Sequence, residues 1–131
     1  MDKHELKERM VDFAVRIVKM VDAMPNTISG NAIARQIVRS GTSPSANYRA
    51  ACMAKSYKDF INKLKMVEEE LDETCHWIDL IIRCQMLPAK RLEPLAQEST
   101  ELLSIIAKSI ITTKARIEAD NNTKRKPILG E

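Results

Sequence analysis

Glu73 and His76 have the spacing of an ExxH motif, which places a carboxylate and an imidazole on the same side of a helix. Two such motifs and two further glutamates hold the metal pair in ferritin-like di-iron bundles. The only other histidine, His4, lies outside any ExxH motif. Helical geometry also turns His76 roughly 160° away from the apolar line of its own segment. We therefore expect His76 to face solvent and predict no metal site.

Acidic residues crowd the segment just before this motif. Glu68, Glu69, Glu70 and Asp72 precede Glu73, and pairs among them have the side chains needed for acid–base chemistry. The sequence around them holds no apolar stretch that would form a concave site. This pattern favours a solvated helix face. The chain also has no Walker loop, no GxGxxG motif and no Ser–His–Asp arrangement. The sequence therefore predicts a protein that is not an enzyme and that holds no cofactor.

The three cysteines, Cys52, Cys75 and Cys84, are odd in number and lack the CxxC spacing of zinc sites. They are typical of reduced, mostly buried thiols in a cytoplasmic protein. No apolar run approaches the roughly 18 residues that span a bilayer, and the charged start differs from a signal peptide. We expect a soluble cytoplasmic protein with no membrane partner.

Charge is strongly segregated along the chain, although the net charge is only +3. Residues 31–67 carry a net charge of +6, and residues 68–79 carry −6. The candidate nucleic-acid contacts are the basic residues of the first stretch: Arg35, Arg39, Arg49, Lys55, Lys58, Lys63 and Lys65. Only two tyrosines interleave with them, and no recognition motif accompanies them. Solvated helix faces and phosphate contacts both remain open interpretations of this pattern.

Helices must position all of these side chains, because apolar residues recur every three or four positions. The first helix is predicted from about Lys3 to Met24, where Pro25 stops it. Asn31 is the predicted cap of the second helix. Pro44 lies inside that helix and lacks an amide donor, so we expect a break or kink there.

The clearest periodicity follows Ser56, which is the predicted cap of a third helix over residues 57–86. A fourth helix is predicted to begin between Ala89 and Pro94. Short connections between long helices favour an all-α, antiparallel up-down-up-down four-helix bundle over residues 1–119. Residues 120–131 are polar and are predicted to form a flexible C-terminal tail.

Two of these helices carry more apolar surface than one core requires. The candidate oligomer interface comprises residues that lie away from the main apolar lines of the first and third helices: Val11, Val15, Val18, Trp77, Leu80 and Cys84. A wide core is one explanation for them, and a homo-oligomer interface is the other. Trp77 is the best anchor for an interface because its large ring also carries a donor.

A family resemblance rests on one long motif. It runs through Gln36-Ile37-Val38-Arg39-Ser40-Gly41-Thr42-Ser43-Pro44-Ser45-Ala46-Asn47-Tyr48-Arg49-Ala50-Ala51-Cys52 and then Ser56, Asp59-Phe60-Ile61, Lys63-Leu64-Lys65, Val67-Glu68-Glu69-Glu70, Asp72-Glu73 and Trp77. Over about residues 5–118 the chain resembles the four helix bundle protein family, which includes proteins encoded by intervening sequences in bacterial 23S ribosomal RNA genes. It is similar, more distantly, to the accessory protein of diversity-generating retroelements.

The resemblance implies an antiparallel four-helix bundle that assembles as a ring-shaped homopentamer and whose function is largely unassigned. It supplies no catalytic residue. The retroelement accessory proteins are markedly basic and bind nucleic acid and a reverse transcriptase, and the acidic block at residues 68–79 departs from that pattern.

Two functional hypotheses follow from the sequence. The first is a non-catalytic homo-oligomeric interaction or scaffold protein, accessory to a nucleic-acid process. The second is a protein that binds RNA or DNA directly through the basic segment 35–65.

Overall fold

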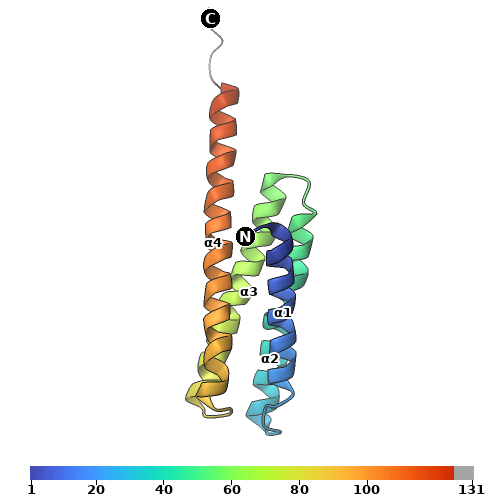
Figure 1. Ribbon diagram of the computed structural model, residues 1–131, viewed down its shortest axis with the longest axis vertical. Coiled ribbons are helices and arrows are strands. Elements are labelled where there is room, and N and C mark those ends of the chain that lie inside the picture. The colour runs from blue at the N-terminus through green and yellow to red at the C-terminus, as the bar shows by residue number, and fades with distance from the viewer. Residues whose placement is uncertain (126–131) are drawn as a thin grey trace, which may run out of the picture.

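The computed structural model describes residues 1–125, which form four helices and no strand. The helices are α1 (Lys3–Val21), α2 (Ile28–Cys52), α3 (Tyr57–Arg83) and α4 (Ala89–Arg125). The connections α1–α2 and α3–α4 lie at one end of the molecule, and the α2–α3 connection lies towards the other (Figure 1). The predicted all-α four-helix bundle is confirmed. No helix among these residues has the length and apolar character needed to cross a membrane.

Side-chain caps explain where three of the helices begin. Asp2, Thr27 and Ser56 each accept a hydrogen bond from the backbone amide three residues later, at 2.8, 3.0 and 3.1 Å. Each bond satisfies one of the amides that a helix N-terminus leaves without a partner. The predicted Ser56 cap is confirmed. The predicted Asn31 cap is wrong, because Thr27 caps α2 and Asn31 lies within its first turn.

Pro44 lies inside α2, which runs without interruption from Ile28 to Cys52. The predicted break is therefore absent, and a kink stays a prediction. Pro44 is buried, and because proline has no amide hydrogen, α2 lacks one backbone hydrogen bond at this position.

The core lies between the helices and is built from apolar side chains at helical spacing. Its largest fully buried members include Phe13, Ile37, Leu64, Ile78 and Ile106. Contacts are extensive for α1–α2, α2–α3 and α3–α4 and sparse for α1–α4. The wide side of the bundle therefore lies between α1 and α4.

An ion-pair cluster spans that wide side. The Arg9 guanidinium of α1 donates to both carboxylate oxygens of Glu98 in α4, at 2.8 and 2.5 Å, and to Glu101 at 2.6 Å. Bidentate Arg–carboxylate pairs are the stronger kind of ion pair. Arg9 thus holds α1 to α4 where apolar contact is thin.

The last helix extends well beyond its neighbours (Figure 1). Ile110 is the last buried residue of α4, and residues 111–124 are exposed or half-buried. Residues 120–125 continue α4 as a helix, and the flexibility expected from residue 120 onwards stays a prediction. The rest of that predicted tail, residues 126–131, lies outside the described residues.

Candidate functional site

The two ExxH residues contact neighbouring side chains. The Glu73 carboxylate pairs with the Arg39 guanidinium and accepts a hydrogen bond from the Trp77 indole at 3.0 Å. His76 is exposed, and its ring lies edge-on to Trp77 with 4.8 Å between centroids. Within residues 1–125 no three His, Cys, Asp or Glu side chains are grouped to hold a metal ion. Glu73 acts instead as a contact between α2 and α3.

The remaining acidic residues divide between helix contacts and solvent. Glu70 accepts a hydrogen bond from the Asn47 side-chain amide at 2.7 Å and lies 3.8 Å from Arg39. Glu68, Glu69 and Asp72 border a shallow hollow of about 360 Å³.

The cysteines are free thiols with different surroundings. Cys52 and Cys75 are half-buried, and the Cys75 sulfur lies 3.1 Å from the Ser99 hydroxyl oxygen. Cys84 is exposed, which corrects the expectation of mostly buried thiols for this residue. Cys52 lies near Tyr48, whose pKa is raised by burial and by the neighbouring thiol.

The seven candidate nucleic-acid contacts differ in whether an acidic side chain pairs with them. Arg39 is engaged with the acidic residues of α3, and Lys63 pairs with Asp59 at 3.2 Å. The other five are exposed and form no ion pair within residues 1–125: Arg35, Arg49, Lys55, Lys58 and Lys65. Helical spacing places Arg35 and Arg49 on the outer face of α2, and Lys58 and Lys65 on the outer face of α3.

The candidate oligomer interface has two parts that differ in exposure. Val11, Val15 and Val18 are 46%, 45% and 43% exposed and follow one face of α1 at spacings of four and three. On α3, Trp77 packs against the core and is half-buried, as is Leu80. Cys84 follows the end of α3 and is exposed. The α1 valines therefore form an apolar surface stripe, whereas the α3 residues are partly absorbed by the bundle.

The motif that carries the family resemblance is used for helix packing. The hydroxyls of Ser40 and Thr74 lie 2.9 Å apart and are fully buried between α2 and α3. Gly41 lies against Ile17 of α1, where an added β-carbon would stand only 2.7 Å from an Ile17 side-chain carbon. Arg39 and Asn47 complete the set through their contacts with the α3 glutamates. These residues fix the positions of α1, α2 and α3.

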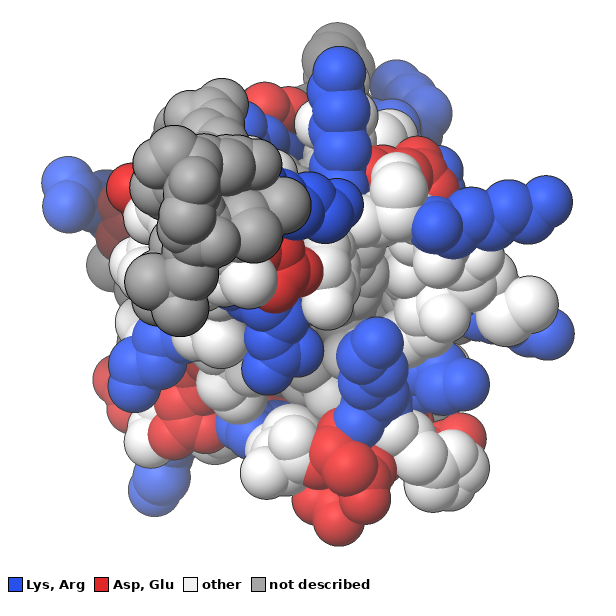
Figure 2. Space-filling view, turned by 90° about the horizontal axis from the view of Figure 1, so that it is seen from above, with Lys and Arg blue, Asp and Glu red and all other residues white. Residues whose placement is uncertain are grey.

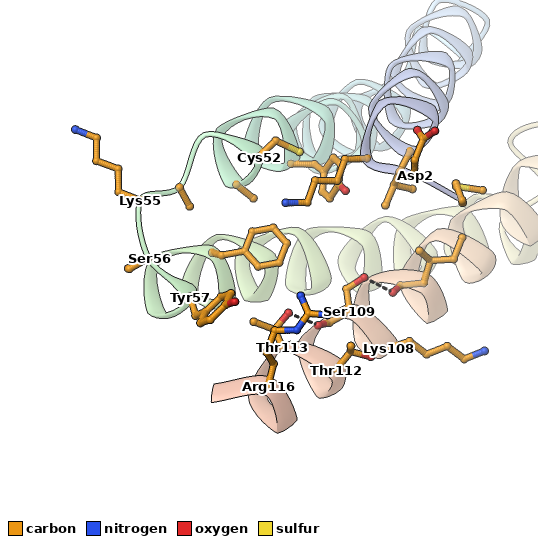
Figure 3. A pocket seen from close by; sticks show the side chains of 18 residues that line it. Asp2, Cys52, Lys55, Ser56, Tyr57, Lys108, Ser109, Thr112, Thr113 and Arg116 are labelled. Carbon is orange, nitrogen blue, oxygen red and sulfur yellow. Dashed lines mark hydrogen bonds between the residues drawn. The ribbon is translucent and has the colours of Figure 1, made fainter. Parts of the chain in front are cut away.

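Sequence reasoning missed a groove of about 1050 Å³ at the end of the bundle where α1 and α3 begin (Figure 3). Residues from all four helices line it, including Phe60 of α3 and Arg116 of α4. Its α4 wall includes Ser109, Thr112 and Thr113, polar residues that flank Ile110, the last buried residue of the helix. The one sequence feature that could have indicated this groove is the polar continuation of α4 past the core.

Comparison with known proteins supports the predicted resemblance. The family model for the 23S rRNA-intervening sequence protein matches residues 2–108. The structure is similar to the crystal structure of a protein of unknown function from the S23 ribosomal protein family of Bacteroides thetaiotaomicron, with a TM-score of 0.76 and 37% identity over 80% of this chain and 97% of that chain. Comparison with curated proteins gave no match. The chain belongs to the 23S rRNA-intervening sequence protein family.

Proposed function

We propose that this chain is a cytoplasmic, non-catalytic interaction or scaffold protein that assembles with copies of itself as a homopentamer. The observation that carries the proposal is the exposed valine stripe of α1, Val11, Val15 and Val18. Covering the exposed half of each valine would contribute on the order of 1 kcal/mol. A stripe of this kind is a usual feature of a surface that another protein covers.

The arrangement of the helices favours a ring over a two-fold dimer. The backbones of α1 and α3 do not pack side by side, although Lys3 reaches Phe60, so the two helices lie on different sides of the bundle. Their outer faces, bearing the valine stripe and the Trp77–Leu80 region, therefore point in different directions. A head-to-tail interface between two different faces closes into a ring when the rotation permits. The homopentamer expected from the family resemblance is such a ring.

The interaction role is also supported by the way the polar side chains are used. Arg39, Glu73 and Asn47, which stand out in the sequence, contact other helices rather than converge on a cavity. A scaffold requires a rigid bundle with distinct outer faces, and these contacts supply that rigidity. We place this protein as an accessory to a nucleic-acid process because the outer faces of α2 and α3 carry basic residues.

The test is a Val15→Glu substitution, which puts a charge in the middle of the stripe without removing a core contact. We expect light scattering to show a smaller particle and circular dichroism to show unchanged helicity. Ile111→Glu is the matched control, because Ile111 is 68% exposed on α4 and lies outside the stripe. An unchanged mass for Val15→Glu, or the same loss for Ile111→Glu, would contradict the proposed interface. Trp77 suits this test less well because it also packs against the core.

Direct binding of RNA or DNA is the second candidate function. It is favoured by the exposed basic residues without ion partners in residues 1–125, especially Arg35, Arg49 and Lys58. Counterion release predicts affinity that falls steeply with salt and that is lost when these three become alanine. Lys90 and Arg91, exposed at the start of α4 and outside the basic faces of α2 and α3, supply the control substitutions. Absence of binding at low salt in a filter assay would eliminate this function.

A further inference from the structure

The groove at the α1–α3 end has an apolar floor and walls from four helices. Its volume of about 1050 Å³ lies near the upper end of the range for small-molecule sites. The apolar lining comes from residues that continue the core towards this end: Leu6, Tyr48, Ala51, Phe60 and Ile105. An apolar body that entered the groove would therefore contact the same kind of surface that the core helices bury.

Cations dominate the charged groups around this floor. The Lys3 amine lies over the Phe60 ring, 4.9 Å from its centroid. The Arg116 side chain reaches back from α4 towards the groove, whereas Lys55 and Lys108 extend away from it (Figure 3). Lys and Arg side chains also project around this end of the molecule, with acidic side chains among them (Figure 2). Lys3 of α1 and Arg116 of α4 are therefore two cations that border the groove from different helices.

A single acidic residue lines the groove, and its carboxylate is already engaged. Asp2 accepts a hydrogen bond from the Glu5 amide at 2.8 Å as the cap of α1. That bond lowers the pKa of the Asp2 carboxyl. No ion pair within residues 1–125 involves Lys3 or Arg116.

Aromatic side chains are concentrated at the same place. Tyr48, Tyr57 and Phe60, three of the five aromatic residues of the chain, line this one groove. Flat rings favour stacked or edge-to-face contact with another aromatic ring. The lining therefore suits a flat aromatic body better than a flexible aliphatic chain.

The groove also depends on the part of α4 that continues past the family match. That match ends at residue 108, and Ser109, Thr112, Thr113 and Arg116 form much of the α4 wall. The hydroxyls of Ser109 and Thr113 donate to carbonyls one turn earlier in α4, which leaves their oxygen lone pairs towards solvent. This wall is thus a property of this chain's own C-terminal helix.

We propose that the groove binds a small soluble aromatic anion, whose ring system lies on the Phe60 and Tyr57 side and whose single anionic group lies between Lys3 and Arg116. The apolar lining supplies affinity for the ring system, and the two cations select for the charge. This binding site is separate from the valine stripe and from the basic outer faces of α2 and α3.

Fluorescence titration with 8-anilinonaphthalene-1-sulfonate tests this proposal on the full chain. We expect saturable binding with one site per chain. The variant Lys3→Gln/Arg116→Gln should weaken binding about tenfold, because it removes both charge-assisted contacts. N-phenyl-1-naphthylamine, which has the same rings without the sulfonate, should bind this variant and the parent chain equally. Lys90→Gln/Arg91→Gln is the matched control and should leave both titrations unchanged.

Three results would overturn the proposal: titration without saturation, equal affinity of the parent chain and Lys3→Gln/Arg116→Gln for the sulfonate, or equal weakening by the Lys90→Gln/Arg91→Gln control. The four substituted residues are exposed, so loss of folding is not expected. Circular dichroism checks this. If the double variant proves unfolded, amide chemical shifts of the parent chain replace it. Sulfonate-induced shifts at Ala51, Phe60 and Ile105 support the site, and shifts confined to α1 valines contradict it.

Discussion

Gly41 is buried in the middle of α2, where it faces Ile17 of α1. A β-carbon at this position would stand 2.7 and 2.8 Å from the two γ-carbons of Ile17 and 3.0 Å from its δ-carbon. Contacts below about 3.0 Å are repulsive, since attractive carbon contacts lie at about 3.5–4.0 Å. A β-branched side chain in a helix has essentially one χ1 rotamer, so Ile17 cannot turn both γ-carbons away. The two helices must move apart to accommodate an alanine.

Two opposing effects set the size of the Gly41→Ala change. Alanine in a helix interior is favoured over glycine by about 1 kcal/mol. Overpacking of a tight core contact costs about 1–3 kcal/mol, and Ile17 is fully buried with no room to yield. Because both γ-carbons clash, we place the cost at the upper part of this range. Gly41→Ala is therefore expected to lower the free energy of unfolding by about 1–2 kcal/mol.

The effect of Gly41→Ala on the free energy of unfolding should change sign when the Ile17 side chain is removed. In an Ile17→Ala background the two γ-carbons are gone, and the new methyl group partly fills the space that they leave. Gly41→Ala should then raise the free energy of unfolding by about 1 kcal/mol, which gives a coupling of about 2–3 kcal/mol between the two sites. Urea unfolding of all four proteins by circular dichroism, at one fixed protein concentration, measures this coupling. Stabilisation by Gly41→Ala alone, or equal effects in both backgrounds, would refute the reasoning.

Two further predictions concern polar contacts between helices. The Arg9 guanidinium lowers the pKa of the Glu98 carboxyl below its ordinary value of 4.5, so this pair stabilises the fold above about pH 4.5 and less as the pH falls through the lowered value. Arg9→Met should lower the free energy of unfolding by about 1–2 kcal/mol at pH 7. Urea titrations at decreasing pH should show that the difference in unfolding free energy between the parent chain and this variant becomes smaller. A difference that does not change with pH would contradict this prediction. Thr74→Val removes one hydroxyl of the buried pair with Ser40 and should lower the free energy of unfolding by about 1–2 kcal/mol. Adding Ser40→Ala to this variant should restore part of that loss. Additive losses of the two substitutions in urea unfolding would contradict the coupling.

The number and extent of the helices could be predicted because each buries a stripe of apolar residues at a regular spacing. The start of α2 could not be placed reliably from composition alone. Thr27 and Asn31 are both good capping residues, and only the extended backbone at Thr27 decides between them. The unbroken helix at Pro44 could not be predicted, because the sequence shows the missing backbone bond but not the burial of the proline ring.

The sequence indicated which residues are exposed, but it did not indicate which side chains pair with each other. Helical spacing correctly puts the α1 valines and most of the basic residues outside the core. The pairing of Arg39 with Glu73 joins residues 34 positions apart, so it depends on how α2 and α3 are set against each other. Prediction of the groove requires the relative positions of three helices, because its residues Lys3, Phe60 and Arg116 belong to α1, α3 and α4. Its existence follows from α4 running past the core.

The way the family motif is used explains why family membership predicts architecture better than activity. Ser40, Gly41 and Arg39 hold α2 against α1 and α3, and each contact fails if its partner changes. A motif of this kind preserves the relative positions of the helices and leaves their outer faces unconstrained. Function can then vary through the outer faces and through the length of α4, without altering the bundle. The valine stripe of α1 and the groove wall that α4 builds beyond residue 108 are therefore the surfaces where this chain's own role should be sought.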